Sequence, residues 1–361
     1  MTDEAQLDVG VDMPVAPMLA KLARSIPDGD GWLFEPKWDG FRCIVYRDGD
    51  RTELISRKLR PLGRYFPELI GPLERALPER CVVDGEIVVA DQGGRGLDFD
   101  ALLQRIHPAK SRIERLAGET PAQFVAFDVL ADDRVPWTGR PMRERRDHLE
   151  AILEPNSSVH LTPASLDRRV AETWFHQFEG AGLDGIVAKP VEGIYEPGKR
   201  SLVKVKHQRT AECAVPGFRI HKDGNGVGSL LLGLYDAEGN MASVGVAAAF
   251  SVKRRAELLE QLVPRTEGAL DGHPWRDWAE SQGEGPAPPS AGSRWNAGKD
   301  LSFVPIRMGL VAEVAFGQLE GGRFRHGVTF LRWRPDRTPQ SCRYDQLEVA
   351  DPVPFDDFIN R

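Results

Sequence analysis

Lys37 lies near the start of the chain among residue types that suit covalent catalysis. It follows a short apolar run and precedes Asp39-Gly40 and an alternating strand pattern. A lysine amine becomes a nucleophile when burial or nearby cations lower its pKa. Gly40 would let the backbone approach a phosphate, because glycine has no Cβ. A K-x-D-G segment alone is equally compatible with a surface turn, so the hypothesis of a nucleophilic lysine depends on the residues that follow.

Five further segments follow Lys37 in order, and each holds residues that suit a nucleotide site. They are Ser56-Arg57-Lys58, Asp84-Gly85-Glu86, Phe127-Asp128-Val129-Leu130, Asp184-Gly185-Ile186-Val187-Ala188-Lys189 and Leu202-Val203-Lys204-Val205-Lys206. A lone Glu86 is costly in an apolar strand unless it binds something. Lys204 and Lys206 fall on one face of a strand, where two close positive charges favour a phosphate between them. Each segment alone has an ordinary structural explanation, but six in this order indicate one site.

The elements that must position these residues are mainly strands. Alternating apolar residues predict strands over 41–46, 52–56, 81–90, 124–130, 185–189 and 202–206. Helical spacing predicts helices over 99–106, 142–153 and 168–178. We therefore expect a first domain, residues 1–208, with an α+β fold of mainly antiparallel sheets and flanking helices.

The pattern changes after about residue 207. Strand patterns cover 212–221, 229–235, 241–250, 310–318 and 325–334, and one helix pattern covers 251–262. Five strands with one helix are typical of a small all-β barrel of the oligonucleotide/oligosaccharide-binding (OB) type. The Pro/Gly/Ser-rich stretch 281–293 is expected to be a long loop. We expect this second domain to span residues 209–361 and to end in an acidic tail.

Charge and composition narrow the function classes. The net charge of the 361 residues is −7, but 195–210 and 323–337 are rich in Lys and Arg, so the overall acidity does not exclude a basic face. The four cysteines are widely scattered, which supports neither a zinc site nor a disulfide framework. No apolar run approaches the ~20 residues of a membrane span, and the acidic start does not resemble a signal peptide. We expect a cytoplasmic protein.

Together these motifs resemble the covalent nucleotidyltransferases and, within them, the ATP-dependent DNA ligases, especially the short bacterial ligases of the LigC type. The resemblance runs from about Pro14 to Arg343. It implies an adenylation domain followed by an OB-fold domain. It also implies ATP as the cofactor with Mg²⁺, or Mn²⁺ as an alternative, and nicked double-stranded DNA as the partner.

The resemblance assigns roles at the nucleotide. Lys37 would form the phosphoamide bond with AMP, and Glu35 would help to recognise adenine. Phe127 would stack on the adenine ring. Lys204 and Lys206 would grip the α-phosphate.

Other roles concern the ribose, the metal and the DNA. Arg42 and Glu86 would hold the ribose and later the phosphate of the nick. Asp184, with Glu86, would bind the catalytic metal. Arg57 and Arg200 would contact DNA.

The chain departs from the family pattern at two positions. The family usually has Glu where Asp184 stands, and the shorter side chain favours metal contact through water. The last motif is present as 330–337, but Arg337 replaces the usual lysine beside Asp336. Arg keeps the charge and adds a bidentate fork, so we expect Asp336 and Arg337 still to act on the nucleotide. Lys189 completes the expected nucleotide-binding set.

Three rival interpretations differ in what they require. An NAD-dependent ligase needs an extra N-terminal domain and a four-cysteine zinc finger, but 36 residues precede Lys37 and the cysteines do not cluster. An RNA ligase or a capping-type guanylyltransferase shares the lysine and most motifs, and stays the main alternative. A catalytically inactive nucleic-acid-binding module would form no covalent nucleotide adduct. We expect a monomeric repair ligase, with repair-protein partners that the sequence does not identify.

Overall fold

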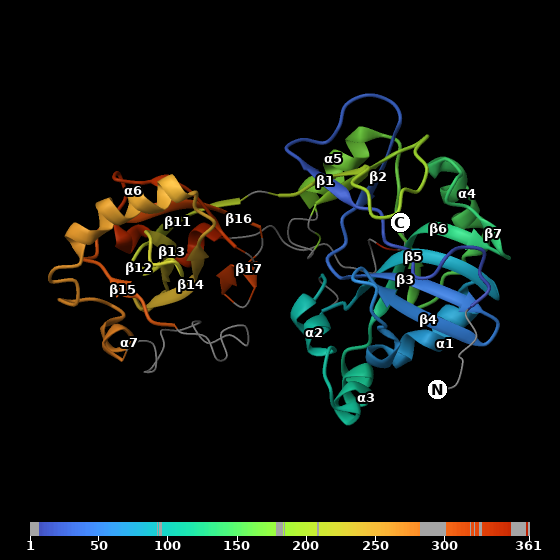
Figure 1. The fold of residues 1–361 in the computed structure, drawn as a ribbon, viewed down its shortest axis with the longest axis horizontal. Helices are drawn as coiled ribbons and strands as arrows, with labels where there is room; N and C mark the ends of the chain where they lie inside the picture. The colour runs from blue at the N-terminus through green and yellow to red at the C-terminus, as the bar shows by residue number, and fades with distance from the viewer. Residues whose placement is uncertain are drawn as a thin grey trace. The chain divides into compact units, whose positions relative to one another are not determined.

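The structure, a computed structural model, describes residues 7–91, 93, 96–177, 183, 185–207, 209–281, 301–317, 319–320, 322–324, 327–347 and 359. The chain forms two compact units (Figure 1): Met1–His207 with Val349–Arg361, and Gln208–Glu348. Asp184, most of the predicted 281–293 loop and most of the acidic tail lie outside the described residues. Ile359 packs in a hydrophobic cluster of the first unit, whereas the sequence analysis placed the tail with the barrel.

A six-stranded sheet forms the larger core of the first unit. Its order is β4-β3-β5-β6-β7, with β8 beside β6. The strands are β3 (Phe41–Asp48), β4 (Arg51–Ser56), β5 (Arg80–Val88), β6 (Gln123–Asp132), β7 (Val135–Pro136) and β8 (Val159–Leu161). β8 runs parallel to β6, and the other pairs are antiparallel. The predicted strands 41–46, 52–56, 81–90 and 124–130 are therefore confirmed, with shifted ends.

Four helices accompany this sheet. They are α1 (Pro67–Ala76), α2 (Phe99–Gln104), α3 (Lys110–Glu119) and α4 (Met142–Ile152). Of these, α4 packs on β6 and α1 packs on β8, while α3 packs on α1. α1 begins with Pro67, which suits a first helical position because no intrahelical partner is needed there. Leu69 and Leu73, one turn apart on α1, are buried in the cluster that holds Val45 and Val83. The predicted helix 142–153 is α4.

A four-stranded sheet completes the first unit, in the order β1-β10-β9-β2. Its strands are β1 (Ala20–Ala23), β2 (Trp32–Pro36), β9 (Ile186–Pro190) and β10 (Leu202–Val205), and α5 (Arg168–Gln177) packs on β2 and β9. β9 and β10 match predicted strands. β1 and β2 were missed because their burial does not alternate: Lys21 and Leu22 are both exposed, and 33–36 are all buried.

The second unit is a barrel of antiparallel strands. They are β11 (Arg209–Ala214), β12 (Gly217–Ile220), β13 (Val227–Tyr235), β14 (Met241–Ala247), β15 (Val304–Pro305), β16 (Val311–Phe316) and β19 (Thr329–Trp333). β13 pairs with β14 and β11, β11 pairs with β16, and β16 pairs with β19. A parallel bridge from Ala247 to Val328 closes the ring between β14 and the start of β19. The expected OB-type barrel is confirmed.

The barrel differs from the prediction at one strand. The predicted strand 212–221 is split into β11 and β12, because Pro216 has no N–H with which to continue a ladder. The predicted helix is α6 (Val252–Leu262), and the side chain of Ser251 caps it by accepting from the Arg254 N–H. The other elements are α7 (Arg276–Glu280), β17 (Leu319–Glu320), β18 (Arg323–Phe324) and the 3₁₀ helices η1 (Gly63–Tyr65), η3 (Val263–Arg265), η5 (Pro339–Ser341) and η6 (Tyr344–Leu347).

Candidate active site

A cavity of ≈ 170 Å³ in the first unit collects side chains from both of its sheets. Nine of the predicted site residues line it: Glu35, Lys37, Arg42, Arg57, Glu86, Phe127, Lys189, Arg200 and Lys204. Six of these nine are cationic and two are carboxylates. The excess of positive charge suits a ligand with several phosphates.

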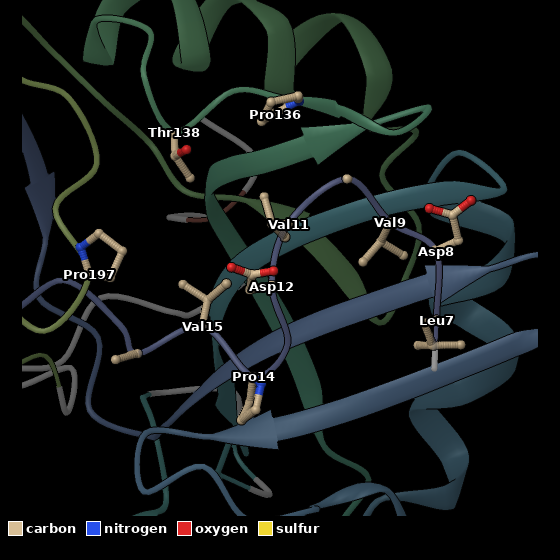
Figure 2. A pocket seen from close by; sticks show the side chains of 12 residues that line it. Leu7, Asp8, Val9, Val11, Asp12, Pro14, Val15, Pro136, Thr138 and Pro197 are labelled. Carbon is tan, nitrogen blue, oxygen red and sulfur yellow. The ribbon is translucent and has the colours of Figure 1, made fainter. Parts of the chain in front are cut away.

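A second hollow of the same unit has ≈ 700 Å³ but different chemistry (Figure 2). Its lining is mainly the N-terminal segment 7–16, together with Pro136, Thr138 and Pro197. The charged residues of this lining are Asp8 and Asp12, whose side chains lie apart from each other in Figure 2. Because carboxylates repel a triphosphate, the smaller cavity is the candidate nucleotide site.

Lys37, which lines the cavity, is held by a backbone hydrogen bond. Its N–H donates to the Gly185 carbonyl at 2.8 Å, which ties the end of β2 to the start of β9. A Cβ on Gly40 would lie 2.1 Å from the Ile87 carbonyl oxygen. The close approach of β3 to β5 therefore explains why this position is glycine, and the approach of its backbone to a phosphate stays a prediction.

Glu35 and Lys189 form a buried ion pair beside the aromatic ring of Phe127. Lys189 Nζ lies 2.9 Å from Glu35 Oε2, donates to the Phe127 carbonyl at 2.8 Å, and stands 4.7 Å from the centre of that ring. Burial raises the pKa of Glu35, while Lys189 and then Arg146 act in the opposite direction. Glu35 Oε1 accepts no hydrogen bond from the described residues. It is thus a ready acceptor for an amino group of a ligand.

Arg42 is fixed between a carboxylate and a ring. Its Nε and Nη2 donate to Asp84 Oδ1 and Oδ2, each at 2.6 Å, and its guanidinium carbon lies 4.4 Å from the centre of the Phe127 ring. Asp84 is fully buried. Sequence reasoning gave Asp84 no role, although it stands two residues before Glu86 and so shares its face of β5.

Glu86, on β5, is a carboxylate of the cavity that interacts electrostatically with the candidate nucleophile Lys37. Burial raises its pKa to about 7, against the opposing charges of Arg42 and Lys37. The described residues hold no group of three or more His, Cys, Asp or Glu side chains that could bind a metal by themselves. Mg²⁺ commonly needs one or two carboxylates together with phosphate oxygens. Glu86 fits that requirement, and the second predicted ligand, Asp184, lies outside the described residues.

The raised pKa of Glu86 predicts how the free energy of unfolding changes with pH. Protonated Glu86 is favoured in the folded protein, so the free energy of unfolding should fall as pH rises from 4.5, the unfolded value, through about 7. Glu86→Gln does not titrate. As pH rises from about 5 to about 8, the free energy of unfolding of Glu86→Gln should therefore increase by about 2.5 kcal/mol relative to that of wild type. This corresponds to several degrees in Tm. Thermal unfolding at both pH values measures this.

The matched control is Glu53→Gln, which changes a half-exposed glutamate on β4, a strand of the same sheet. We expect the change between the two pH values to be smaller for Glu53→Gln than for Glu86→Gln. A difference between Glu86→Gln and wild type that does not change with pH would contradict the raised pKa.

The basic residues expected at phosphate and DNA are partly brought together. Lys204 lines the cavity, whereas β10 ends at Val205, so Lys206 lies beyond the strand and outside the cavity lining. Of the two lysines predicted to share one face of a strand, Lys204 is therefore on the strand and lines the cavity, and Lys206 is not. Arg57 and Arg200 are exposed and line the cavity.

Asp336 and Arg337 lie in the second unit, just after β19. Asp336 pairs with Arg334 at 2.7 Å, and the hydrogen bonds from Arg334 lower the pKa of Asp336 to about 2. Arg337 Nη2 donates to the Ser341 carbonyl at 3.3 Å. These contacts order the motif within its own unit.

Sequence reasoning missed the segment 17–20, which also lines the cavity. Its backbone runs beside β10, since Leu19 N–H donates to the Lys199 carbonyl at 2.7 Å and β1 pairs with β10. No alternating pattern marked this segment.

Among the described helices, none is long and apolar enough to cross a lipid bilayer.

Comparisons with known proteins agree with this architecture. A family model described as "ATP dependent DNA ligase domain" matches residues 17–206, and one described as "ATP dependent DNA ligase C terminal region" matches residues 223–337. The first unit and the barrel thus define a nucleotidyltransferase domain followed by a C-terminal ligase domain. The chain belongs to the ATP-dependent DNA ligases.

Individual relatives narrow the resemblance. DNA ligase C of Mycobacterium tuberculosis is 51% identical over 352 residues, covering 96% of this chain and 97% of that protein. DNA ligase C2 of Mycolicibacterium smegmatis is 52% identical over 347 residues, covering 95% and 96%. A solved structure from work on Lig E DNA ligases covers 89% of this chain and 100% of its own, with a TM-score of 0.55 and 19% identity, which supports the fold. The predicted resemblance to LigC-type bacterial ligases is confirmed.

Proposed function

We propose that this ligase seals 5′-phosphate/3′-hydroxyl nicks in double-stranded DNA through a lysyl-AMP intermediate on Lys37 and then a DNA-adenylate. The observation that carries the proposal is the convergence of Lys37 with five other cationic side chains and two carboxylates in one cavity. Phosphoryl transfer depends mainly on such positioning and charge neutralisation.

In the first step Lys37 Nζ attacks the α-phosphorus of ATP, and the bond to pyrophosphate breaks. Lys204 and Lys206 hold the α-phosphate, while Asp336 and Arg337 act on the leaving pyrophosphate. Glu86 and Asp184 would hold Mg²⁺, or Mn²⁺ as an alternative, which when bound would neutralise phosphate charge.

The base is recognised by two groups that are already positioned. Phe127 stacks on adenine, and Glu35 Oε1, which lies 3.9 Å from Arg146 Nη1 but accepts no hydrogen bond from the described residues, accepts one from the adenine amino group. Guanine presents a carbonyl oxygen at that position, which a carboxylate would repel. Lys189 holds the other oxygen of Glu35 in place.

In the second step the 5′-phosphate of the nick takes AMP from Lys37, and in the third the 3′-hydroxyl displaces AMP. Arg42 and Glu86 hold first the ribose and then the nick phosphate, and Arg57 and Arg200 contact the DNA backbone. Binding that depends on such phosphate contacts weakens as salt increases.

Adenylation belongs to the first unit, and the barrel of the second unit, Gln208–Glu348, adds DNA contacts. The enzyme works as a monomer in the cytoplasm, at the nucleoid, in DNA repair. An RNA ligase or a capping-type enzyme is the alternative that shares the nucleophile.

Incubation with α-labelled ATP and Mg²⁺, followed by a denaturing gel, tests the proposal. A labelled band that nicked DNA discharges, with formation of sealed product, is the expected result. A band that forms with GTP and not with ATP would assign the chain to the capping type, and discharge by nicked RNA alone would assign it to the RNA ligases. No band with either nucleotide would overturn the proposal.

A further inference from the structure

Tyr195 connects the N-terminal segment to the carboxylate that holds Arg42. Its hydroxyl donates to Asp84 Oδ2 at 2.7 Å and accepts the Met18 N–H at 3.1 Å. Tyr195 is 3% exposed and lies between β9 and β10, 111 residues away from Asp84 in the chain. None of the roles assigned above includes this tyrosine.

Asp84 has few other ways to keep its orientation. A carboxylate can rotate about its last side-chain bond, and that rotation is broad rather than confined to one well. The described donors to the Asp84 side chain are Nε and Nη2 of Arg42 and the hydroxyl of Tyr195. Since Arg42 itself is the group to be positioned, the hydrogen bond from Tyr195 is the contact outside the Arg42–Asp84 pair that orients Asp84.

The orientation of Asp84 sets that of Arg42. A bidentate Arg–carboxylate pair fixes the plane of the guanidinium, and the Phe127 ring, 4.4 Å away, confines the same plane from one side. The cation that faces the cavity is therefore aligned by a chain of contacts that begins at Met18 and passes through Tyr195.

We infer that Tyr195 is a positioning residue that aligns Arg42 for the 5′-phosphate of the nick. The inference rests on the proposed function, in which Arg42 binds that phosphate. Tyr195 does not touch the substrate and acts through Asp84.

The chain offers a matched control in Tyr46. Tyr46 is also buried, and its hydroxyl accepts the Val15 N–H at 2.7 Å, so it too is tied to the N-terminal segment. Among the described residues, its hydroxyl makes no hydrogen bond to Asp84. Tyr46→Phe and Tyr195→Phe therefore each remove one hydroxyl that accepts a hydrogen bond from that segment. Only Tyr195→Phe also removes a hydrogen bond to Asp84.

The test compares full-length wild type, Tyr195→Phe and Tyr46→Phe in steady-state sealing of a nicked duplex and in thermal unfolding. We expect Tyr195→Phe to raise the KM for the nick about tenfold, the effect of one hydrogen bond to a charged group. Tyr46→Phe should stay within about twofold of wild type, because a site away from the phosphate contacts changes little. Asp84→Asn, which keeps the shape of the side chain and removes its charge, should raise KM in the same way.

A double-mutant cycle shows whether the effect passes through Arg42. Lysine cannot form the bidentate pair, so Tyr195→Phe should add no further rise in KM to Arg42→Lys. Additive effects, or equal KM values in the two tyrosine variants, would overturn the inference while lysyl-AMP formation and sealing by wild type uphold the proposed function. Failure of wild type to form lysyl-AMP would overturn both.

Discussion

Replacement of Lys37 by alanine is expected to abolish the covalent enzyme–AMP adduct, with a loss of roughly 10⁴-fold or more, as for removal of other enzymatic nucleophiles. The side chain lines the cavity, and its backbone is held by the Gly185 carbonyl. A variant without the amine retains the cavity but has no atom to accept the AMP. The measurement is the rate of label transfer from α-labelled ATP to protein.

Two further variants sharpen this result. Lys37→Arg keeps the positive charge but stays protonated at all accessible pH values, so it should also form no adduct. Lys110→Ala removes an exposed lysine on α3 that does not line the cavity and should label at the wild-type rate. An adduct on Lys37→Ala would move the nucleophile to another residue and contradict the mechanism.

Replacement of Lys204 by alanine is expected to lower the rate of adenylation by roughly 100-fold, the usual effect of removing one group that stabilises charge in a transition state. Lys204 lies on β10 and lines the cavity that also holds Lys37. Single-turnover adduct formation, measured over a range of ATP concentrations, separates the loss of rate from a loss of ATP affinity.

Lys206→Ala is the informative comparison. We expect it to lower adenylation as well, but less than Lys204→Ala, because Lys206 lies beyond the end of the strand and outside the cavity lining. If Lys204→Ala adenylated as fast as Lys110→Ala, Lys204 would have no role at the α-phosphate. If Lys206→Ala had no effect, only Lys204 would keep that role.

The site was predictable from the sequence as far as its residues belong to short motif segments that follow one another in a fixed order. Lys37, Glu86, Phe127 and Lys204 were chosen from motif segments, and the structure brings all four into one cavity. The barrel was predictable for a similar reason, since its strands alternate locally and are bounded by turn residues. Local patterns of this kind need no knowledge of which strand lies beside which.

The tertiary structure alone decided which residues act on one another. The ion pair between Glu35 and Lys189, and the contact between Tyr195 and Asp84, join residues more than a hundred positions apart. No spacing rule reaches across such distances, because the pairing of β2 with β9 sets the first contact and the packing of the β9–β10 connection near β5 sets the second. Gly40 shows the same limit: the sequence marked the glycine, but only the fold shows that the Ile87 carbonyl occupies the space a Cβ would need.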